Sequence, residues 1–186
     1  MTQQNILWTG IFYHSLENCV VSVTGTGAEI RSCIVGSHGD TIYKVDYLIT
    51  VNRNWETAYV EMKSQLNGTI HSSIFQRALP GNWEIDGYPS DQFRGCIDID
   101  ISLTPFTNSL PINRLKLDMH EERQINVLYI DILGREVKEV RQKYTRLSEL
   151  EYKYENVPND FEAIIQVDRS GLVVNYPGLF ERTAIK

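Results

Sequence analysis

Hydrophobic and polar residues alternate with a period of two along much of this chain. Between Ile42 and Leu48, the side chains of Tyr43, Val45 and Tyr47 fall on one face of an extended segment. The same alternation returns in three later segments: Ile125, Val127 and Tyr129; Leu150, Tyr152 and Tyr154; and Phe161, Ala163, Ile165 and Val167. Because successive side chains of a strand point to opposite faces, this pattern predicts strands with one apolar face.

Turn-forming residues separate these segments at short intervals. The turns are Gly25-Thr26-Gly27, Ser37-His38-Gly39-Asp40, Asn67-Gly68, Pro80-Gly81-Asn82, Asp86-Gly87, Pro158-Asn159-Asp160 and Ser170-Gly171. Many short strands at such spacing predict an all-β domain. The stretch from Arg141 to Tyr154 also fits alternation better than a helical period, so it is predicted to be mostly strand.

The chain is predicted to form a single domain over residues 1–186, because this length suits one core and no linker divides it. A pattern of glutamine, glycine and tyrosine occurs twice, as Gln76, Gly81 and Tyr88 and as Gln166, Gly171 and Tyr176. This repetition suggests two related β-meanders, over about residues 41–95 and 124–180, joined by a central segment. Chance similarity among strands separated by Gly and Pro is the alternative interpretation.

The central segment changes its period partway along. Ile97, Ile99, Ile101 and Leu103 fall on one face, and Cys96, Asp98, Asp100 and Ser102 fall on the other. The alternation stops at Thr104-Pro105, where Thr104 suits a helix N-cap and Pro105 suits the first helical position. Pro111 follows soon after, so any helix here is predicted to be short.

The apolar residues of this segment are too many for an exposed connection, so residues 104–115 are predicted to form a buried hub. They are Leu103, Phe106, Leu110, Ile112 and Leu115.

The run from Cys96 to Leu115 resembles the hallmark segment of the putative glycolipid-binding proteins, a bacterial family. Three further segments agree with that family in the same order: Asn82-Trp83-Glu84-Ile85-Asp86-Gly87, Gln142-Lys143-Tyr144-Thr145, and Asp168-Arg169-Ser170-Gly171-Leu172-Val173 followed by Tyr176-Pro177. The resemblance implies a mainly β fold, a spiral β-roll in which a long curved antiparallel sheet wraps around a single α-helix. It also implies a homodimer that binds a glycolipid or another amphipathic small molecule. Tyr144, which lies in one of these segments, is a further candidate ligand-binding residue.

Asp98 and Asp100 are the obvious acid–base candidates. Their Cα atoms should lie about 6.6 Å apart on one strand face, near the roughly 6.5–9.5 Å carboxyl separation of inverting glycosidases. Any strand with alternating aspartates has this spacing, so an acidic outer face is one interpretation. A second is that the aspartates anchor Arg114 or the turn at Thr104, and a third is a catalytic pair.

Arg114, Thr107 and Asn108 could contact a ligand head group. Arg114 lies between Ile112 and Leu115, so its stem should be partly buried and its guanidinium should pair with a carboxylate. A structural ion pair is therefore preferred for Arg114 over a ligand contact. Thr107 and Asn108 could bind sugar hydroxyls or could satisfy the backbone of the turn.

Trp55 and Trp83 each stand beside an asparagine and an acid, in Arg53-Asn54-Trp55-Glu56 and Asn82-Trp83-Glu84. Such groupings suit a site that stacks on a sugar ring and binds its hydroxyls. A tryptophan at a strand end can equally belong to the core. Both residues are kept as candidate ligand contacts.

The composition excludes several classes of function. The net charge is −6 with interspersed signs, which argues against a nucleic-acid partner. The apolar runs are too short to cross a membrane, and the N-terminus lacks the pattern of a secretory signal. The four histidines lack metal-binding spacing, so no metal or other cofactor is expected. The three cysteines are predicted to be free thiols of a cytoplasmic protein.

The favoured hypothesis is a non-enzymatic protein that holds a glycolipid or other lipid in a curved sheet. One alternative is a hydrolase that acts on a glycoside or lipid ester with Asp98 and Asp100 as acid and base. The other is a dimeric interaction module without a small-molecule site, whose exposed sheet edges pair with each other.

Overall fold

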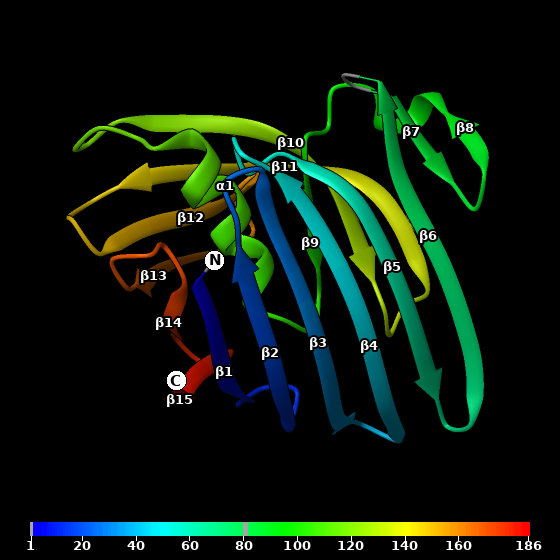
Figure 1. The fold of residues 1–186 in the computed structure, drawn as a ribbon. Helices are drawn as coiled ribbons and strands as arrows, with labels where there is room; N and C mark the ends of the chain where they lie inside the picture. The colour runs from blue at the N-terminus through cyan, green and yellow to red at the C-terminus, as the bar shows by residue number, and fades with distance from the viewer. Residues whose placement is uncertain (1, 80–81) are drawn as a thin grey trace.

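One continuous sheet of fifteen strands forms most of this protein (Figure 1). The computed structural model describes residues 2–79 and 82–186. The strands are β1 (Thr2–Gly10), β2 (Ser15–Val23), β3 (Gly27–His38), β4 (Thr41–Asn52), β5 (Thr57–Leu66), β6 (Thr69–Leu79), β7 (Asn82–Ile85), β8 (Tyr88–Ser90), β9 (Asp98–Ile101), β10 (Glu122–Asp131), β11 (Glu136–Arg146), β12 (Glu151–Val157), β13 (Glu162–Val167), β14 (Val173–Tyr176) and β15 (Phe180–Ile185). The mainly β prediction is confirmed.

The two ends of the chain meet in the middle of the sheet. The strand order is β8-β7-β6-β5-β4-β3-β2-β1-β15-β14-β13-β12-β11-β10-β9, so β1 pairs with β15 and each half of the chain runs outward from that pair. Neighbouring strands are antiparallel except β9 and β10, which are parallel. The fully antiparallel sheet that the resemblance implied is therefore wrong at this pair, because the segment between β9 and β10 crosses over before β10 begins.

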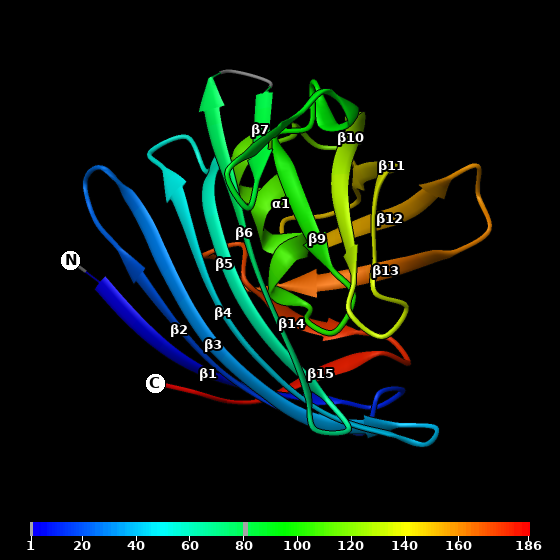
Figure 2. The same cartoon turned by 90° about the vertical axis from the view of Figure 1, so that its right-hand side faces the viewer.

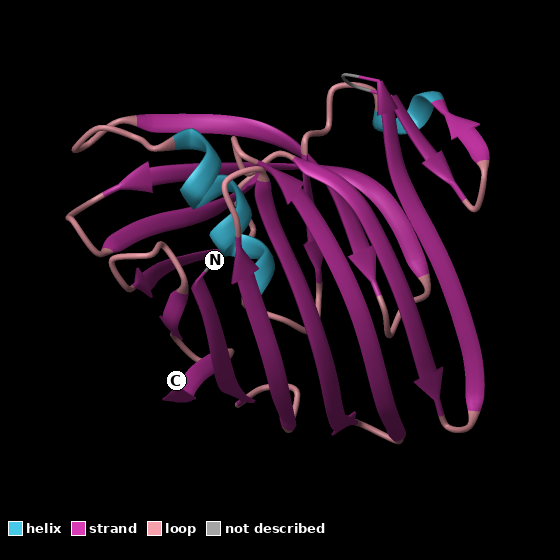
Figure 3. Ribbon diagram, viewed as in Figure 1, coloured by secondary structure: helices cyan, strands magenta, loops and turns pink. Residues whose placement is uncertain are grey.

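The sheet is strongly curved, and the central segment lies on its concave side (Figure 2). This segment contains a 3₁₀ turn, η2 (Phe106–Asn108), and a helix, α1 (Ser109–Leu115), which is the one α-helix of the described residues (Figure 3). A second 3₁₀ turn, η1 (Asp91–Phe93), follows β8. The helix α1 therefore lies on the inner side of the curved sheet.

The buried hub is confirmed. Leu103, Phe106 and Leu110 are completely buried, and Ile112 is 4% exposed. The predicted short helix is also confirmed, although Pro111 lies within α1 instead of ending it. Pro111 is tolerated there because the N–H groups of a first helical turn have no intrahelical partner to lose.

Most predicted turns are confirmed. Asn67 and Gly68 join β5 to β6 with φ angles of +47° and +87°, as a tight hairpin turn requires. Residues 141–146 belong to β11 and residues 151–154 to β12, so this stretch is mostly strand, as predicted. Pro80 and Gly81 of one predicted turn lie outside the described residues, and the internal repeat stays a prediction.

The cysteines are free thiols, as predicted. Cys19 and Cys96 are buried and Cys33 is half-buried. Burial raises the pKa of the Cys96 thiol to about 12, which makes it a poor nucleophile at neutral pH.

Candidate ligand-binding site

A cavity of about 980 Å³ lies between the central segment and the strands of the C-terminal half. Its wall is built by residues of β9, η2, β10, β11, β12, β14 and β15, and by the turn between β1 and β2. Small-molecule sites usually measure roughly 300–1,000 Å³, so this cavity is large enough for a lipid-sized ligand. The curvature of the sheet and the position of the hub together create it.

Aromatic side chains form one continuous part of the wall. Tyr154 lies against Phe161 and Tyr176, with ring centroids 6.1 Å apart in both pairs, and Tyr176 lies 6.3 Å from Phe180. Tyr13 extends the row by stacking on Phe180 at 5.7 Å. Phe161 is 37% exposed, which places it where the cavity opens to solvent. The wall therefore offers apolar faces from the opening inward.

The polar part of the wall centres on Asp100. Thr107 Oγ1 donates a hydrogen bond of 2.9 Å to Asp100 Oδ1, and Gln142 Nε2 donates one of 2.7 Å to Asp100 Oδ2. Asp100 forms no ion pair with any basic side chain of the described residues. Burial raises the pKa of this carboxyl, and the hydrogen bonds from Thr107 and Gln142 oppose that rise.

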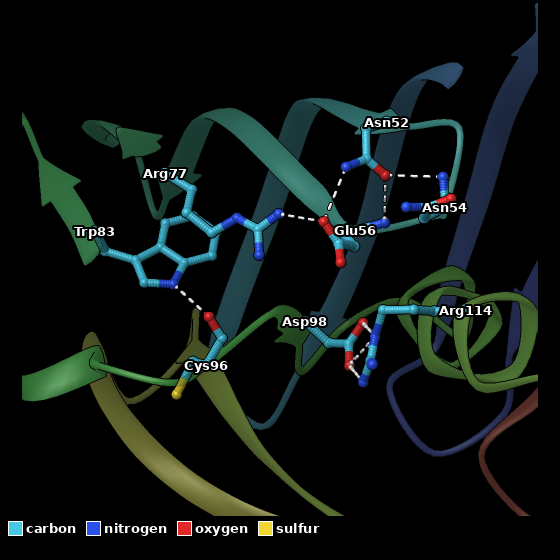
Figure 4. A network of polar contacts seen from close by, with 8 residues as sticks. All are labelled: Asn52, Asn54, Glu56, Arg77, Trp83, Cys96, Asp98 and Arg114. Atoms are coloured by element: carbon cyan, nitrogen blue, oxygen red, sulfur yellow. Dashed lines mark hydrogen bonds and ion pairs between the residues drawn. The ribbon is translucent and has the colours of Figure 1, made fainter. Parts of the chain in front are cut away.

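Asp98 has a different role from Asp100. Arg114 Nε and Nη2 donate hydrogen bonds of 3.0 and 2.6 Å to its two carboxylate oxygens (Figure 4). Asp98 is completely buried, so the acidic outer face is wrong and the anchoring role toward Arg114 is confirmed. Burial still raises the pKa of Asp98, and the Arg114 guanidinium opposes that rise.

The hydrolase hypothesis needed both aspartates at one reaction site. Asp100 lines the cavity, whereas Asp98 does not and is already held by Arg114. The two carboxylates therefore do not face the cavity as an acid–base pair.

The remaining candidates of the central region support the cavity wall. Thr107 is buried outside the cavity lining and donates its hydrogen bond to Asp100 from there. Its hydroxyl oxygen also accepts a hydrogen bond of 3.3 Å from the N–H of Ile101. Tyr144 is 1% exposed and donates a 2.9 Å hydrogen bond to Asn108 Oδ1. Of these residues only Asn108 lines the cavity, beside Asp100.

The two tryptophan candidates lie outside the cavity. Trp83 is completely buried, and its indole N–H donates a 2.9 Å hydrogen bond to the carbonyl of Cys96 (Figure 4). Trp55 is half-buried in the turn between β4 and β5 and packs against the larger hydrophobic core. The placement of both residues corrects the sugar-stacking interpretation, because neither ring reaches the cavity wall.

A second ion pair, which the sequence did not suggest, lies near the first (Figure 4). Arg77 Nη2 contacts Glu56 Oε2 at 3.0 Å, and Asn52 Nδ2 donates to the same oxygen at 2.9 Å. The hydrogen bond from Asn52 is the largest cause that lowers the pKa of Glu56, followed by the contact with Arg77. Each carboxylate is already matched by a base, so this network is structural.

The sequence analysis also missed Glu17 on β2. Glu17 is 2% exposed, and its Oε1 accepts hydrogen bonds from the hydroxyls of Ser32 at 2.7 Å, Tyr47 at 2.6 Å and Thr104 at 2.9 Å. Its Oε2 has no hydrogen-bond partner among the described residues. Burial raises the pKa of Glu17 to about 7. Because Thr104 lines the cavity, Glu17 fixes the wall to the N-terminal strands.

Residues 5–182 match the family model described as "Putative glycolipid-binding". A comparison with curated proteins gave no match. None of the helices in the described part of the chain has the length and apolar character that a membrane crossing requires.

Two solved structures resemble this one. A DUF1089 family protein from Pseudomonas aeruginosa shares 32% sequence identity, with a TM-score of 0.79 over 89% of this chain and 91% of that chain. A β-barrel-like protein with a domain of unknown function, DUF1849, from Brucella abortus has a TM-score of 0.52 and 7% identity, over 99% of this chain and 96% of that chain. The second likeness concerns the fold alone.

Proposed function

The chain belongs to the putative glycolipid-binding family, and on this premise we propose that it is a non-enzymatic protein that holds a glycolipid in the cavity beside Asp100. The observation that carries the proposal is the cavity of about 980 Å³, with an aromatic part and a polar part in one wall. A ligand with an alkyl chain and a hydroxyl-rich head group matches both parts.

The aromatic part of the wall would supply most of the binding free energy. Burial of an alkyl chain contributes about 0.8 kcal/mol per CH₂ group, so a chain lying along Tyr154, Phe161 and Tyr176 gains several kcal/mol. Asp100 and Asn108 would orient the head group, because carboxylate and amide groups hydrogen-bond to hydroxyls. This division of roles places the sugar inside and the alkyl chain toward the opening.

The finer features implied by the family resemblance belong to the same proposal. We propose that the curved sheet works as a spiral roll around α1, with the helix held as a fixed inner support for the cavity. A homodimer and a cytoplasmic location are part of the proposal as well. The interaction-module alternative predicts the dimer but no ligand in the cavity.

Native mass spectrometry and lipid extraction of the protein purified from bacteria test the proposal. We expect a bound amphipathic molecule, and we expect Val140→Trp to remove it, because Val140 lines the cavity. Val35→Trp is the matched control, since Val35 is 48% exposed on β3 and lies outside the cavity wall. A ligand that stays on the Val140→Trp protein, or none on the wild type with or without added glycolipid, would contradict the proposal.

A further inference from the structure

The charged side chain at the polar centre of the cavity wall is that of Asp100, and its charge is negative. Asp100 is surrounded by protein yet keeps partial exposure, because its carboxylate faces the cavity. Thr107 and Gln142 each occupy one of its oxygens with a neutral donor. Neither donor brings a positive charge, so the carboxylate is hydrogen-bonded but not neutralised.

The influence of this charge reaches other strands of the wall. Tyr129 lies beside Asp100 on the paired strand β10, whereas Tyr154 and Tyr176 line the cavity from β12 and β14. Burial is the largest cause that raises the pKa values of these three tyrosines, and the charge of Asp100 is the next for each. The negative field of Asp100 is therefore felt by wall residues from three strands.

The basic residues of the wall do not offset this field inside. Lys138 Nζ pairs with Glu136 at 2.7 Å, and its side chain is 45% exposed. Arg141 is exposed as well, and the acidic residues Glu139 and Asp160 share the wall with these two. Charges of both signs at the solvent side roughly balance. The charge of Asp100 therefore determines the sign of the electrostatic potential inside the cavity.

The cavity also offers neutral hydrogen-bonding groups. Tyr13 and Tyr176 line it, and neither hydroxyl forms a hydrogen bond with another of the described residues. Sugar hydroxyls can donate to Asp100 and accept from these tyrosines, whereas an ammonium group could only donate. An anion would meet the uncompensated carboxylate.

We propose that Asp100 makes this cavity selective for uncharged, hydroxyl-rich head groups and excludes lipids with a negatively charged head group. The inference rests on the proposed function and adds the class of glycolipid, a neutral one. Exclusion by an unpaired like charge is a direct means of specificity, because it weakens the wrong ligand without new contacts to the right one.

Three probes with the same alkyl chain test this inference: n-decyl-β-maltoside, n-decanesulfonate and n-decylammonium, titrated below their micelle concentrations by calorimetry. At pH 8 we expect the maltoside to bind at least about tenfold more tightly than the sulfonate, because like charges at one site repel strongly. The charge of Asp100 attracts the ammonium probe, but an ammonium group cannot accept hydrogen bonds from Tyr13 and Tyr176. We therefore expect it to bind no more tightly than the maltoside.

Asp100→Asn should bring the sulfonate affinity to within about threefold of the maltoside affinity. The side-chain amide of Gln142 can rotate so that its oxygen accepts a hydrogen bond from the NH₂ group of the new asparagine. The variant therefore keeps the hydrogen bond between β9 and β11 in the cavity wall. Asp40→Asn, the same change on an exposed turn outside the cavity, should leave the tenfold preference unchanged. If Asp100→Asn does not fold, titrations of the wild type at lower pH replace it. Protonation of Asp100 should reduce the preference for the maltoside over the sulfonate. Because burial raises the pKa of Asp100, this reduction should begin at a pH above the usual titration range of an aspartate.

Each other outcome decides a separate question. Equal binding of sulfonate and maltoside to the wild type would overturn the inference and leave the proposed function standing. Tighter binding of the ammonium probe would overturn it in favour of a cationic ligand. Binding of none of the three would count against the proposed function itself.

Discussion

Glu17 should make the stability of this protein depend on pH in an unusual direction. In the folded state burial raises the pKa of Glu17 from 4.5 to about 7. Between these two values the folded protein holds a proton that the unfolded chain releases, so the free energy of unfolding falls as the pH rises. The stabilisation is fully present below pH 4.5 and is lost once the pH passes about 7.

The loss of unfolding free energy follows from the difference between the pKa values of Glu17 in the folded and unfolded states. A shift of one pKa unit corresponds to about 1.4 kcal/mol, so the change for Glu17 amounts to roughly 3 kcal/mol in total. A loss of this size is a substantial part of the 5–15 kcal/mol that usually stabilises a domain, an order-of-magnitude range. Glu17→Gln removes the titration and keeps an amide oxygen for the hydroxyls of Ser32, Tyr47 and Thr104.

Urea unfolding followed by tryptophan fluorescence from pH 4 to pH 9 measures this effect. The free energy of unfolding of Glu17→Gln, relative to that of the wild type, should rise by about 3 kcal/mol from the lowest to the highest pH. Glu149→Gln, on an exposed turn before β12, is the matched control and should follow the wild type. If the difference between Glu17→Gln and the wild type is the same at every pH, Glu17 does not titrate as argued.

Three further predictions concern the hub and the assembly. Arg114→Leu should cost about 3–5 kcal/mol of unfolding free energy because it leaves Asp98 charged and buried; adding Asp98→Asn should recover part of that loss, and an additive double variant in urea unfolding would refute the coupling. Phe106→Ala should also cost about 3–5 kcal/mol, and a melting temperature within a degree or two of the wild type would show that the hub does not support the sheet. Size-exclusion chromatography with light scattering should give twice the mass of one chain, and a monomer at all concentrations would contradict the homodimer.

The strands could be predicted from the sequence because their inner faces follow a simple rule. Tyr43, Val45 and Tyr47 alternate with polar residues, and all three are buried as the alternation requires. The hub was also predictable, since a short segment with Phe106 and Leu110 has too many apolar side chains for the surface.

The roles of the two aspartates were not predictable from alternation. A period of two separates the faces of a strand but does not show which face meets water, and β9 is covered on both sides. Asp98 is therefore buried against Arg114, and Asp100 faces a cavity. Only the three-dimensional position of the central segment distinguishes them.

The aromatic part of the cavity wall could not be predicted from the sequence either. Tyr13, Tyr154 and Phe180 come from distant parts of the chain and meet only because β1 pairs with β15 in the middle of the sheet. The sequence showed that tyrosine is abundant, but strands favour aromatic residues in any case. Glu17 gave no signal either, because a polar residue in a strand ordinarily faces solvent.

A crystal structure of the protein with n-decyl-β-maltoside tests the central claim most directly. The account predicts the sugar within hydrogen-bond distance of Asp100 and the alkyl chain along Tyr154 and Phe161, inside the cavity of about 980 Å³. A maltoside bound elsewhere, with the cavity free of it at saturating concentration, would contradict the account.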